Sequence, residues 1–285
     1  MRHVIIHGLR RSGTTILWET LRSDPRLRCY DEPFHPRLAA GRRDNHKGTW
    51  TEFKALLETG ALTPVPILPE EELLERSSPD QVAWLGALCR NGAPCVIDVV
   101  RGWNRAPALH AACGPVMSVH LLRDPASWVA AHLLPSGAAT VRRRIASLYR
   151  RASFFRRRGF YDNYQYQTII EAALAQDHPV FAHVALSCAA LRREPAFVKL
   201  LAFWWGANQV LAGRLRASGQ PWLCTTLPGF SRQPRIELDR IARAAGWEPL
   251  PVPIDAVRVS APALGETAPQ WRRAAQRLGL PEALF

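Results

Sequence analysis

Residues 8–15 constrain the fold of this chain more than any other part of the sequence. They comprise a glycine, four further residues, a second glycine and then Thr14 and Thr15, close to the phosphate-loop pattern G-x-x-x-x-G-K-[ST]. The apolar run at residues 4–6 predicts a buried strand before this segment, and apolar spacing predicts a helix at residues 14–22. Such a loop can turn successive backbone N–H groups toward an anion. We therefore expect residues 8–15 to hold a phosphate, and an ordinary strand-to-helix turn is the alternative.

The loop departs from the nucleoside triphosphatase pattern at one position. Thr14 stands where that pattern has lysine, and the positive charges lie earlier, at Arg10 and Arg11. A nucleotide kinase needs the lysine for the β- and γ-phosphates and a carboxylate at a strand end for magnesium. Asp124 follows a predicted strand, but Pro125 comes next, so the pair predicts a helix cap and a first helical residue. We expect a phosphate site that needs no metal ion.

Apolar runs elsewhere predict alternating strands and helices. Further buried strands are predicted at residues 95–100, 116–122 and 221–226, and a helix at residues 236–245 is ended by Gly246. This alternation indicates an α/β fold with a central parallel sheet flanked by helices, similar to P-loop nucleoside triphosphatases. No repeat or linker divides the chain, so we expect one domain over residues 1–285.

Two features are expected to be structural rather than functional. The proline-rich residues 63–80 predict an irregular excursion on the surface. His7 and His120 lie in or at the ends of predicted strands, and we expect them to be core histidines with hydrogen-bond partners.

The charge balance indicates an anionic ligand without fixing its class. The chain has 37 lysines and arginines against 24 aspartates and glutamates, a formal net charge of +13, which suits nucleic acid, a membrane surface or a phosphorylated small molecule. A hydrophobic content of 47% excludes disorder as the main state. The six cysteines form no C-x-x-C pair, and no apolar run suits a signal peptide or a membrane span. We therefore expect reduced thiols and a cytoplasmic protein.

Much of the positive charge is concentrated at residues 141–158, which contain eight arginines and no acid. Arg143, Arg150 and Arg157 recur every seven residues, so a helix would place them on one face, opposite an apolar stripe. This face is either simply solvated or forms an electropositive wall that attracts an anionic cofactor or acceptor.

The run R-S-G-T-T at residues 11–15 resembles the 5′-phosphosulfate loop of sulfotransferases that use 3′-phosphoadenosine 5′-phosphosulfate (PAPS). The loop of that family reads P-[RK]-S-G-T-T after the first strand, and Arg10 replaces its proline here. A second family signature, a strand ending in R-D-P before a helix, is matched at residues 123–125. The resemblance covers most of the chain and implies a sulfotransferase fold, PAPS as the donor and PAP as its product.

The resemblance also implies roles for individual residues. Arg11 would stabilise charge on the transferring sulfuryl group, and Arg123 would contact the 3′-phosphate. Ala131 stands where the family has a serine for that phosphate, and we expect Ser127 to replace it. The donor-binding residues are thus expected to be Arg10, Arg11, Ser12, Gly13, Thr14, Thr15, Arg123 and Ser127.

A carboxylate shortly after the first predicted helix is the third similarity. In the tyrosylprotein and related branches of the family a glutamate there is the proposed base, and Glu32 matches it. Transfer of a sulfuryl group to an alcohol needs a group that accepts the hydroxyl proton. We expect Glu32 to be that base, with Asp31 and His35 as alternatives.

The expected function is transfer of a sulfuryl group from PAPS to a hydroxyl of a small molecule, lipid or sugar. The arginine face suits an anionic or amphiphilic acceptor, and no nucleic-acid partner is expected. One alternative is a P-loop small-molecule kinase that uses ATP and magnesium. Another is a basic protein that binds nucleic acid or a membrane through residues 141–158.

Overall fold

The computed structural model describes residues 1–41, 49–58, 63–90, 92–133, 166–252 and 268–282. These residues divide into two compact units. The first unit comprises residues 1–122 and 211–259, and the second comprises residues 123–210 and 260–285. The single domain expected over residues 1–285 stays a prediction. The arginine-rich helix expected at residues 141–158 lies outside the described residues.

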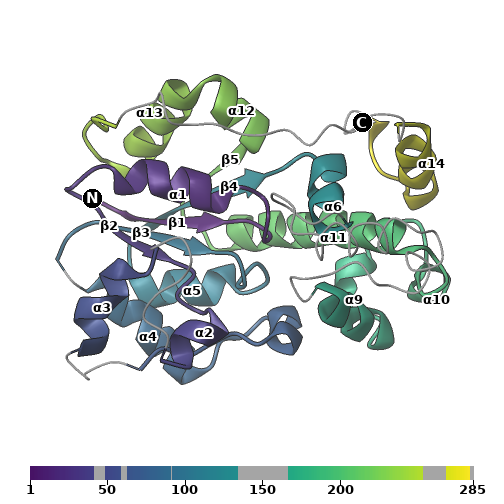
Figure 1. Cartoon of the computed structure of the whole chain (residues 1–285), viewed down its shortest axis with the longest axis horizontal. Coiled ribbons are helices and arrows are strands. Elements are labelled where there is room, and N and C mark those ends of the chain that lie inside the picture. Colours follow the sequence, from purple (N-terminus) through teal and green to yellow (C-terminus); the bar gives the residue numbers. More distant parts are fainter. Residues whose placement is uncertain (42–48, 59–62, 91, 134–165, 253–267, 283–285) are drawn as a thin grey trace, which may run out of the picture. The chain divides into compact units, whose positions relative to one another are not determined.

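The first unit contains a parallel sheet in the order β2-β3-β1-β4-β5 (Figure 1). All of its neighbouring strands run parallel, which confirms the predicted α/β class. The strands are β1 (His3–His7), β2 (Arg28–Asp31), β3 (Cys95–Val99), β4 (Val116–Leu122) and β5 (Trp222–Thr226).

Helices connect the strands and cover both faces of the sheet, as the alternating pattern predicts. Figure 1 shows α1, α12 and α13 over one face and α3, α4 and α5 over the other. Their bounds are α1 (Thr14–Arg22), α3 (Thr51–Glu58), α4 (Pro79–Cys89), α5 (Ala106–Cys113), α12 (Leu227–Arg232) and α13 (Pro234–Ala245). The unit also contains the short α2 (Pro36–Ala39) and a 3-10 helix, η1 (Pro69–Leu73).

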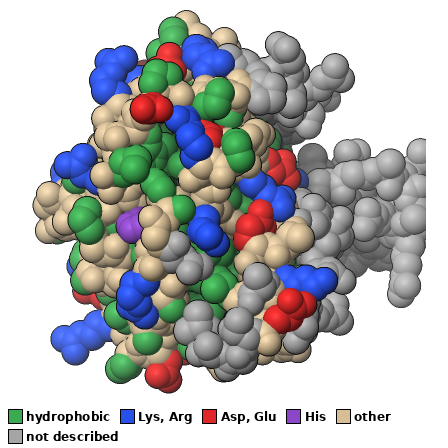
Figure 2. All heavy atoms as spheres, turned by 90° about the vertical axis from the view of Figure 1, so that its left-hand side faces the viewer, with side chains coloured by type: hydrophobic (Ala, Val, Ile, Leu, Met, Phe, Trp, Pro, Cys, Tyr) green, Lys and Arg blue, Asp and Glu red, His purple; other side chains and the backbone are tan. Residues whose placement is uncertain are grey.

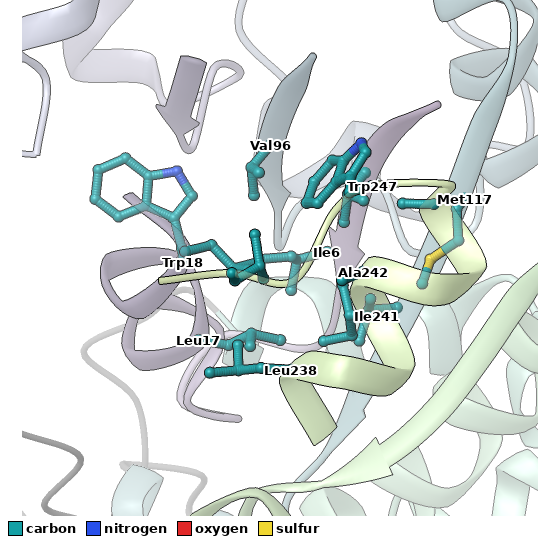
Figure 3. Packing of buried hydrophobic residues seen from close by; sticks show 14 of the residues in the cluster. Ile6, Leu17, Trp18, Val96, Met117, Leu238, Ile241, Ala242 and Trp247 are labelled. Atoms are coloured by element: carbon teal, nitrogen blue, oxygen red, sulfur yellow. The ribbon is translucent and has the colours of Figure 1, made fainter. Parts of the chain in front are cut away.

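The core on the α1 and α13 face is continuous across the sheet. Leu17 and Trp18 of α1 and Ile241 of α13 belong to one buried cluster with strand residues such as Ile6 and Met117 (Figure 3). Burying one such side chain stabilises the fold by about 1.5–3 kcal/mol. This packing therefore fixes the position of α1, whose first turn follows directly after residues 8–13.

The opposite face buries a group of packed aromatic rings. Tyr30 of β2 packs against Phe53 of α3 with ring centroids 5.3 Å apart, and Phe53 stacks on Trp84 of α4 at 5.9 Å. All three side chains are at most 2% exposed. This packing holds the carboxyl end of β2 in place, where the candidate base lies.

Most of the proline-rich residues 63–80 are irregular and exposed or partly exposed, as expected, but three side chains turn inward. Within them, Ile67, Glu72 and Leu73 are buried, and η1 forms a defined turn of helix. The prolines limit the backbone as expected, but the apolar and charged side chains between them insert into the first unit, which sequence spacing did not indicate.

The second unit contains α6 (Pro125–Leu133), α9 (Tyr166–Ala175), η2 (Pro179–Phe181), α10 (Cys188–Leu191) and α14 (Ala268–Leu278). The long α11 (Ala196–Ala217) continues from this unit into the first. Within the second unit, Gly206 of α11 passes so close to η2 that an added Cβ would lie 1.7 Å from the Val180 carbonyl oxygen. No helix in the described ranges is long and apolar enough to cross a bilayer.

The six cysteines are all free, as expected. Four of them are buried, and burial raises the pKa of the Cys95 thiol to about 12. A thiol with such a pKa is protonated at neutral pH and is a poor nucleophile.

Candidate functional site

The loop between β1 and α1 adopts a tight turn. Its Ser12 N–H donates to the Leu9 carbonyl at 3.0 Å, and two of its residues have left-handed backbone, Arg11 at φ 71° and Gly13 at φ 94°. For a non-glycine residue such as Arg11 this conformation costs about 1–3 kcal/mol and persists only where the surroundings enforce it. The curled backbone predicted from the glycine pattern is therefore present.

Both glycines of the loop lie in close contact with neighbouring groups. A Cβ on Gly8 would approach the Thr14 Cγ2 atom to 2.7 Å and the Leu121 carbonyl oxygen of β4 to 3.0 Å. A Cβ on Gly13 would lie 2.7 Å from Leu227, the first residue of α12. The loop is thus wedged between β4 and α12, and glycine is required at both positions.

The N-terminus of α1 follows the loop directly. Its N-cap is Gly13, which has no side chain, so the Thr14 and Thr15 N–H groups at the start of the helix receive no side-chain cap from it. Together with the helix dipole these groups form a site that favours an anion. Thr14 is buried, whereas Thr15 is partly exposed beside it.

Arg10 does not extend freely from the loop. It is 5% exposed and forms an ion pair with Glu72 of η1, whose side chain is fully buried. Glu72 also accepts from Arg101 Nη1 at 3.3 Å. Burial raises the pKa of Glu72, and the two guanidinium groups oppose that rise. Arg10 is therefore fixed by protein contacts on at least one side of its guanidinium group.

Glu32 lies where β2 ends, at the edge of the sheet that also carries the loop after β1. Its backbone N–H donates to the Asp98 carbonyl of β3 at 3.1 Å, and its φ of 47° is left-handed. Its carboxylate Oε2 lies 3.7 Å from Arg101 Nε, and its side chain is 24% exposed. Glu32 is thus a carboxylate that is held from one side and open to solvent on another.

The chain of contacts from Arg10 through Glu72 and Arg101 to Glu32 links the loop to this carboxylate. Sequence reasoning missed Glu72 and Arg101. The signal for Arg101 is its position two residues after β3, because ligand groups in open α/β sheets collect at the carboxyl ends of the strands. Glu72 has no such signal.

The two alternatives to Glu32 are engaged in structural contacts. Asp31 is 4% exposed and accepts a hydrogen bond from the Thr49 hydroxyl. His35 caps α2 by accepting from the Arg37 N–H at 3.1 Å, and burial lowers its pKa to about 4. Both side chains serve the local fold, so the geometry favours Glu32 among the three.

A buried histidine cluster lies on the α5 side of the sheet. His7, at the end of β1, stands 5.7 Å from the ring of His110 of α5, and His110 Nε2 lies 2.7 Å from the Ser118 hydroxyl of β4. Burial lowers the pKa of His7 well below its usual value and that of His110 to about 4. The expectation of a hydrogen-bonded His7 is wrong within the described part of the chain, where neither ring nitrogen has a partner.

Arg123 and Ser127 belong to the second unit. There the Asp124 carboxylate accepts from the Ser127 N–H at 2.8 Å, and Pro125 is the first residue of α6, which confirms the predicted cap. Ser127 is 6% exposed and Arg123 is partly exposed. Their contacts with a 3′-phosphate stay predictions.

No group of three or more histidine, cysteine, aspartate or glutamate side chains that could hold a metal ion occurs among the residues with described positions.

The sequence and the structure were compared with known proteins. No family model matches the sequence, and no curated protein matches it. Among solved structures, a sulfotransferase from Alicyclobacillus acidocaldarius aligns with 99% of this chain and 98% of its own, at 12% identity and a TM-score of 0.39. Sulfotransferase STF1 from Mycobacterium tuberculosis H37Rv aligns with 87% of this chain and 68% of its own, at 13% identity and a TM-score of 0.36.

Proposed function

We propose that this chain is a sulfotransferase that transfers a sulfuryl group from PAPS to an acceptor hydroxyl and releases PAP. One observation supports this more than any other. A phosphate-type loop without the kinase lysine lies at the same edge of the sheet as a partly exposed carboxylate, Glu32. Arg10 of the loop pairs with Glu72, which contacts Arg101, and Arg101 contacts Glu32.

The loop suits the 5′-phosphosulfate end of the donor. The N–H groups at the start of α1, beside Thr14 and Thr15, would hold phosphate oxygens. Arg11 would stabilise negative charge on the transferring group and on the oxygen that bridges sulfur and phosphorus. In this proposal Arg10 contributes mainly by holding the loop in place through Glu72.

Glu32 is the proposed general base. It accepts the proton of the acceptor hydroxyl as that oxygen forms a bond to sulfur, and the bond from sulfur to the bridging phosphate oxygen breaks in line. The electron pair of the broken bond stays on the phosphate of PAP. The proton remains on Glu32 until solvent removes it, which its 24% exposure permits.

Arg123 and Ser127 are proposed to bind the 3′-phosphate, which distinguishes PAP from ADP. A guanidinium group that follows the carboxyl end of a parallel strand is typically placed for ligand binding in such sheets. The positive charge in this scheme comes from arginines and backbone N–H groups, so the proposed reaction uses no metal ion.

The kinase alternative receives less support. Thr14 leaves the loop without the lysine that a kinase directs at the β- and γ-phosphates. On the face drawn in Figure 2, the described lysine and arginine side chains lie among acidic and apolar ones. The nucleic-acid and membrane alternative rests on residues 141–158, which lie outside the described residues, and it stays an alternative.

Turnover by a Glu32→Gln variant tests the proposal. PAP release from PAPS would be followed with a panel of phenols, alcohols and sugars, and the variant should lose at least a hundredfold in kcat, within the range usual for general-base catalysis, about 10²–10⁴-fold. The variant should bind PAP as the wild-type protein does. Glu70→Gln, which changes an exposed carboxylate of η1, is the matched control. Full activity of Glu32→Gln would contradict the assignment of the base.

A further inference from the structure

Glu72 is a buried carboxylate to which the proposed reaction gives no chemical step. Its side chain is fully buried, it is ion-paired with Arg10 of the loop, and one of its oxygens lies 3.3 Å from Arg101 Nη1. Arg10 is 62 residues away from Glu72 in the sequence, so the contact joins two distant segments of the chain.

The backbone on the C-terminal side of Glu72 is held from the segment after β3. Asn104 Nδ2 donates to the Leu73 carbonyl at 2.7 Å, and Arg105 Nε donates to the Leu74 carbonyl at 3.2 Å. Asn104 and Arg105 are each 1% exposed. Both donor side chains are buried, so these hydrogen bonds hold the C-terminal end of η1 in place.

Arg105 also fixes the N-terminal side of Glu72. It donates to the Glu71 carbonyl, and its Nη1 donates to the Gln81 side chain of α4 at 2.6 Å. The carbonyl groups before and after Glu72 are thus tied to one buried guanidinium group. The carboxylate of Glu72 is therefore presented to the loop from a rigid support.

Burying the charged Glu72 and its arginine partners costs free energy, so we ask what this arrangement contributes. Moving an ion out of water costs several kcal/mol even in real proteins, and a buried ion pair is by itself weak evidence for stability. Here the buried carboxylate meets guanidinium groups from two places that the site depends on. Arg10 is the neighbour of the strained Arg11, and Arg101 contacts Glu32.

We propose that Glu72 is a positioning residue that holds the phosphate loop through Arg10 and the Glu32 carboxylate through Arg101. It touches neither donor nor acceptor. The first half of this inference, the anchoring of the loop, is independent of the reaction. The second half rests on the proposed function, because it assumes that Glu32 is the base.

Hydrogen exchange of the ligand-free protein tests the first half. In Glu72→Gln, which keeps the shape of the side chain and removes its charge, amides at residues 9–15 should exchange at least tenfold faster than in wild type. Amides of α13, on the same unit but away from the contact, should be unchanged. The control Glu70→Gln alters an exposed carboxylate of the same helix and should exchange as wild type does. Equal loop exchange in a folded Glu72→Gln would overturn the proposal.

A double variant distinguishes two roles of Glu72, holding the loop in place and neutralising the charge of Arg10. It also provides a test if Glu72→Gln alone does not fold. Arg10→Gln combined with Glu72→Gln removes one buried charge of each sign. If Glu72 anchors the loop, exchange at residues 9–15 remains at least tenfold faster in this variant. If Glu72 serves only to neutralise Arg10, exchange returns to the wild-type rate, and that result overturns the proposal.

Calorimetry measures the Kd of PAP, which should not change if Glu72 only stabilises the fold. Well below its melting temperature, Glu72→Gln should bind PAP at least fivefold more weakly than wild type, and Glu70→Gln should bind it equally. An unchanged Kd in folded Glu72→Gln would overturn the positioning role. If wild-type protein does not bind PAP, the sulfotransferase proposal fails, and loop exchange still decides the role of Glu72.

Discussion

The Nε atom of Arg101 lies 3.7 Å from the Oε2 atom of Glu32, where β3 and β2 reach the same edge of the sheet. Arg101 is 7% exposed on its side chain and Glu32 is 24% exposed. The arginine is therefore buried, whereas the carboxylate is partly accessible to solvent. A general base needs both a fixed position and access to its substrate.

Arg101→Gln should lower kcat by at least tenfold, equivalent to about 1.4 kcal/mol in the activation barrier. The reason is that Glu32 loses the contact that orients its carboxylate. The Kd of PAP should change by less than threefold, because Arg101 is not assigned to the donor. PAP release and calorimetry measure the two effects. Arg37→Gln, an exposed arginine of α2, is the control, and a normal kcat in folded Arg101→Gln would refute the relationship.

Gly13→Ala should destabilise the protein more than the same change at another left-handed glycine. At Gly13 the new Cβ would lie 2.7 Å from Leu227, and the backbone has an unfavourable φ of 94°. At Gly41, with φ 77°, nothing lies within 4 Å. A left-handed non-glycine residue costs about 1–2 kcal/mol, so Gly41→Ala should lose about that much and Gly13→Ala clearly more. Urea unfolding measures both values.

Combining Gly13→Ala with Leu227→Ala separates the two causes. The double variant removes the steric contact but not the backbone strain. Truncating Leu227 has a cost of its own, which the single variant Leu227→Ala measures. Relative to the sum of the two single losses, the double variant should lose less stability, because the steric contact is gone. Equal losses for Gly13→Ala and Gly41→Ala would show that the loop is not wedged against α12.

Stability should fall as the pH drops from about 6.5 toward 4. The pKa of His110 lies near 4 in the folded protein, against 6.5 for an unperturbed histidine, so the unfolded chain binds a proton in this window that the folded chain does not. Stability is therefore full above pH 6.5 and declines below it. Such a difference in pKa corresponds to about 3 kcal/mol at most for this group. His7, whose pKa is also lowered, adds to the same slope.

Unfolding free energies between pH 4 and 7.5 measure this effect. His110→Gln keeps a group that can bond to Ser118 and should reduce the slope. His183→Gln, at an exposed position, should leave the slope unchanged. A slope that is identical in His110→Gln and wild type would contradict a neutral buried His110.

Local sequence patterns predicted the elements that pack by simple periodicity. The helix expected at residues 14–22 is α1, and the strand expected at residues 116–122 is β4, because both bury a regular set of apolar side chains. The strand β2 was not predicted, since it has four residues and carries Arg28 and Asp31 at its ends.

The site could be predicted only where its residues share a local motif. The curled backbone after β1 was predicted from its glycines, although the left-handed Arg11 was not. Glu32 was chosen through the family resemblance, and its role as the base stays a prediction. The burial of Glu72 could not be predicted, because a charged residue in a proline-rich segment is ordinarily exposed. It becomes buried only through partners that the fold brings from Arg10 and Arg101.

The central claim is that the loop binds a 3′,5′-bisphosphate nucleotide and not a triphosphate with magnesium. Calorimetry of the wild-type chain with PAP, with ADP, and with ATP in the presence and absence of magnesium tests it most directly. We predict binding of PAP with a Kd at least tenfold below that of ADP, no dependence on magnesium, and weak or no binding of ATP. Tight, magnesium-dependent binding of ATP together with no binding of PAP would contradict the claim.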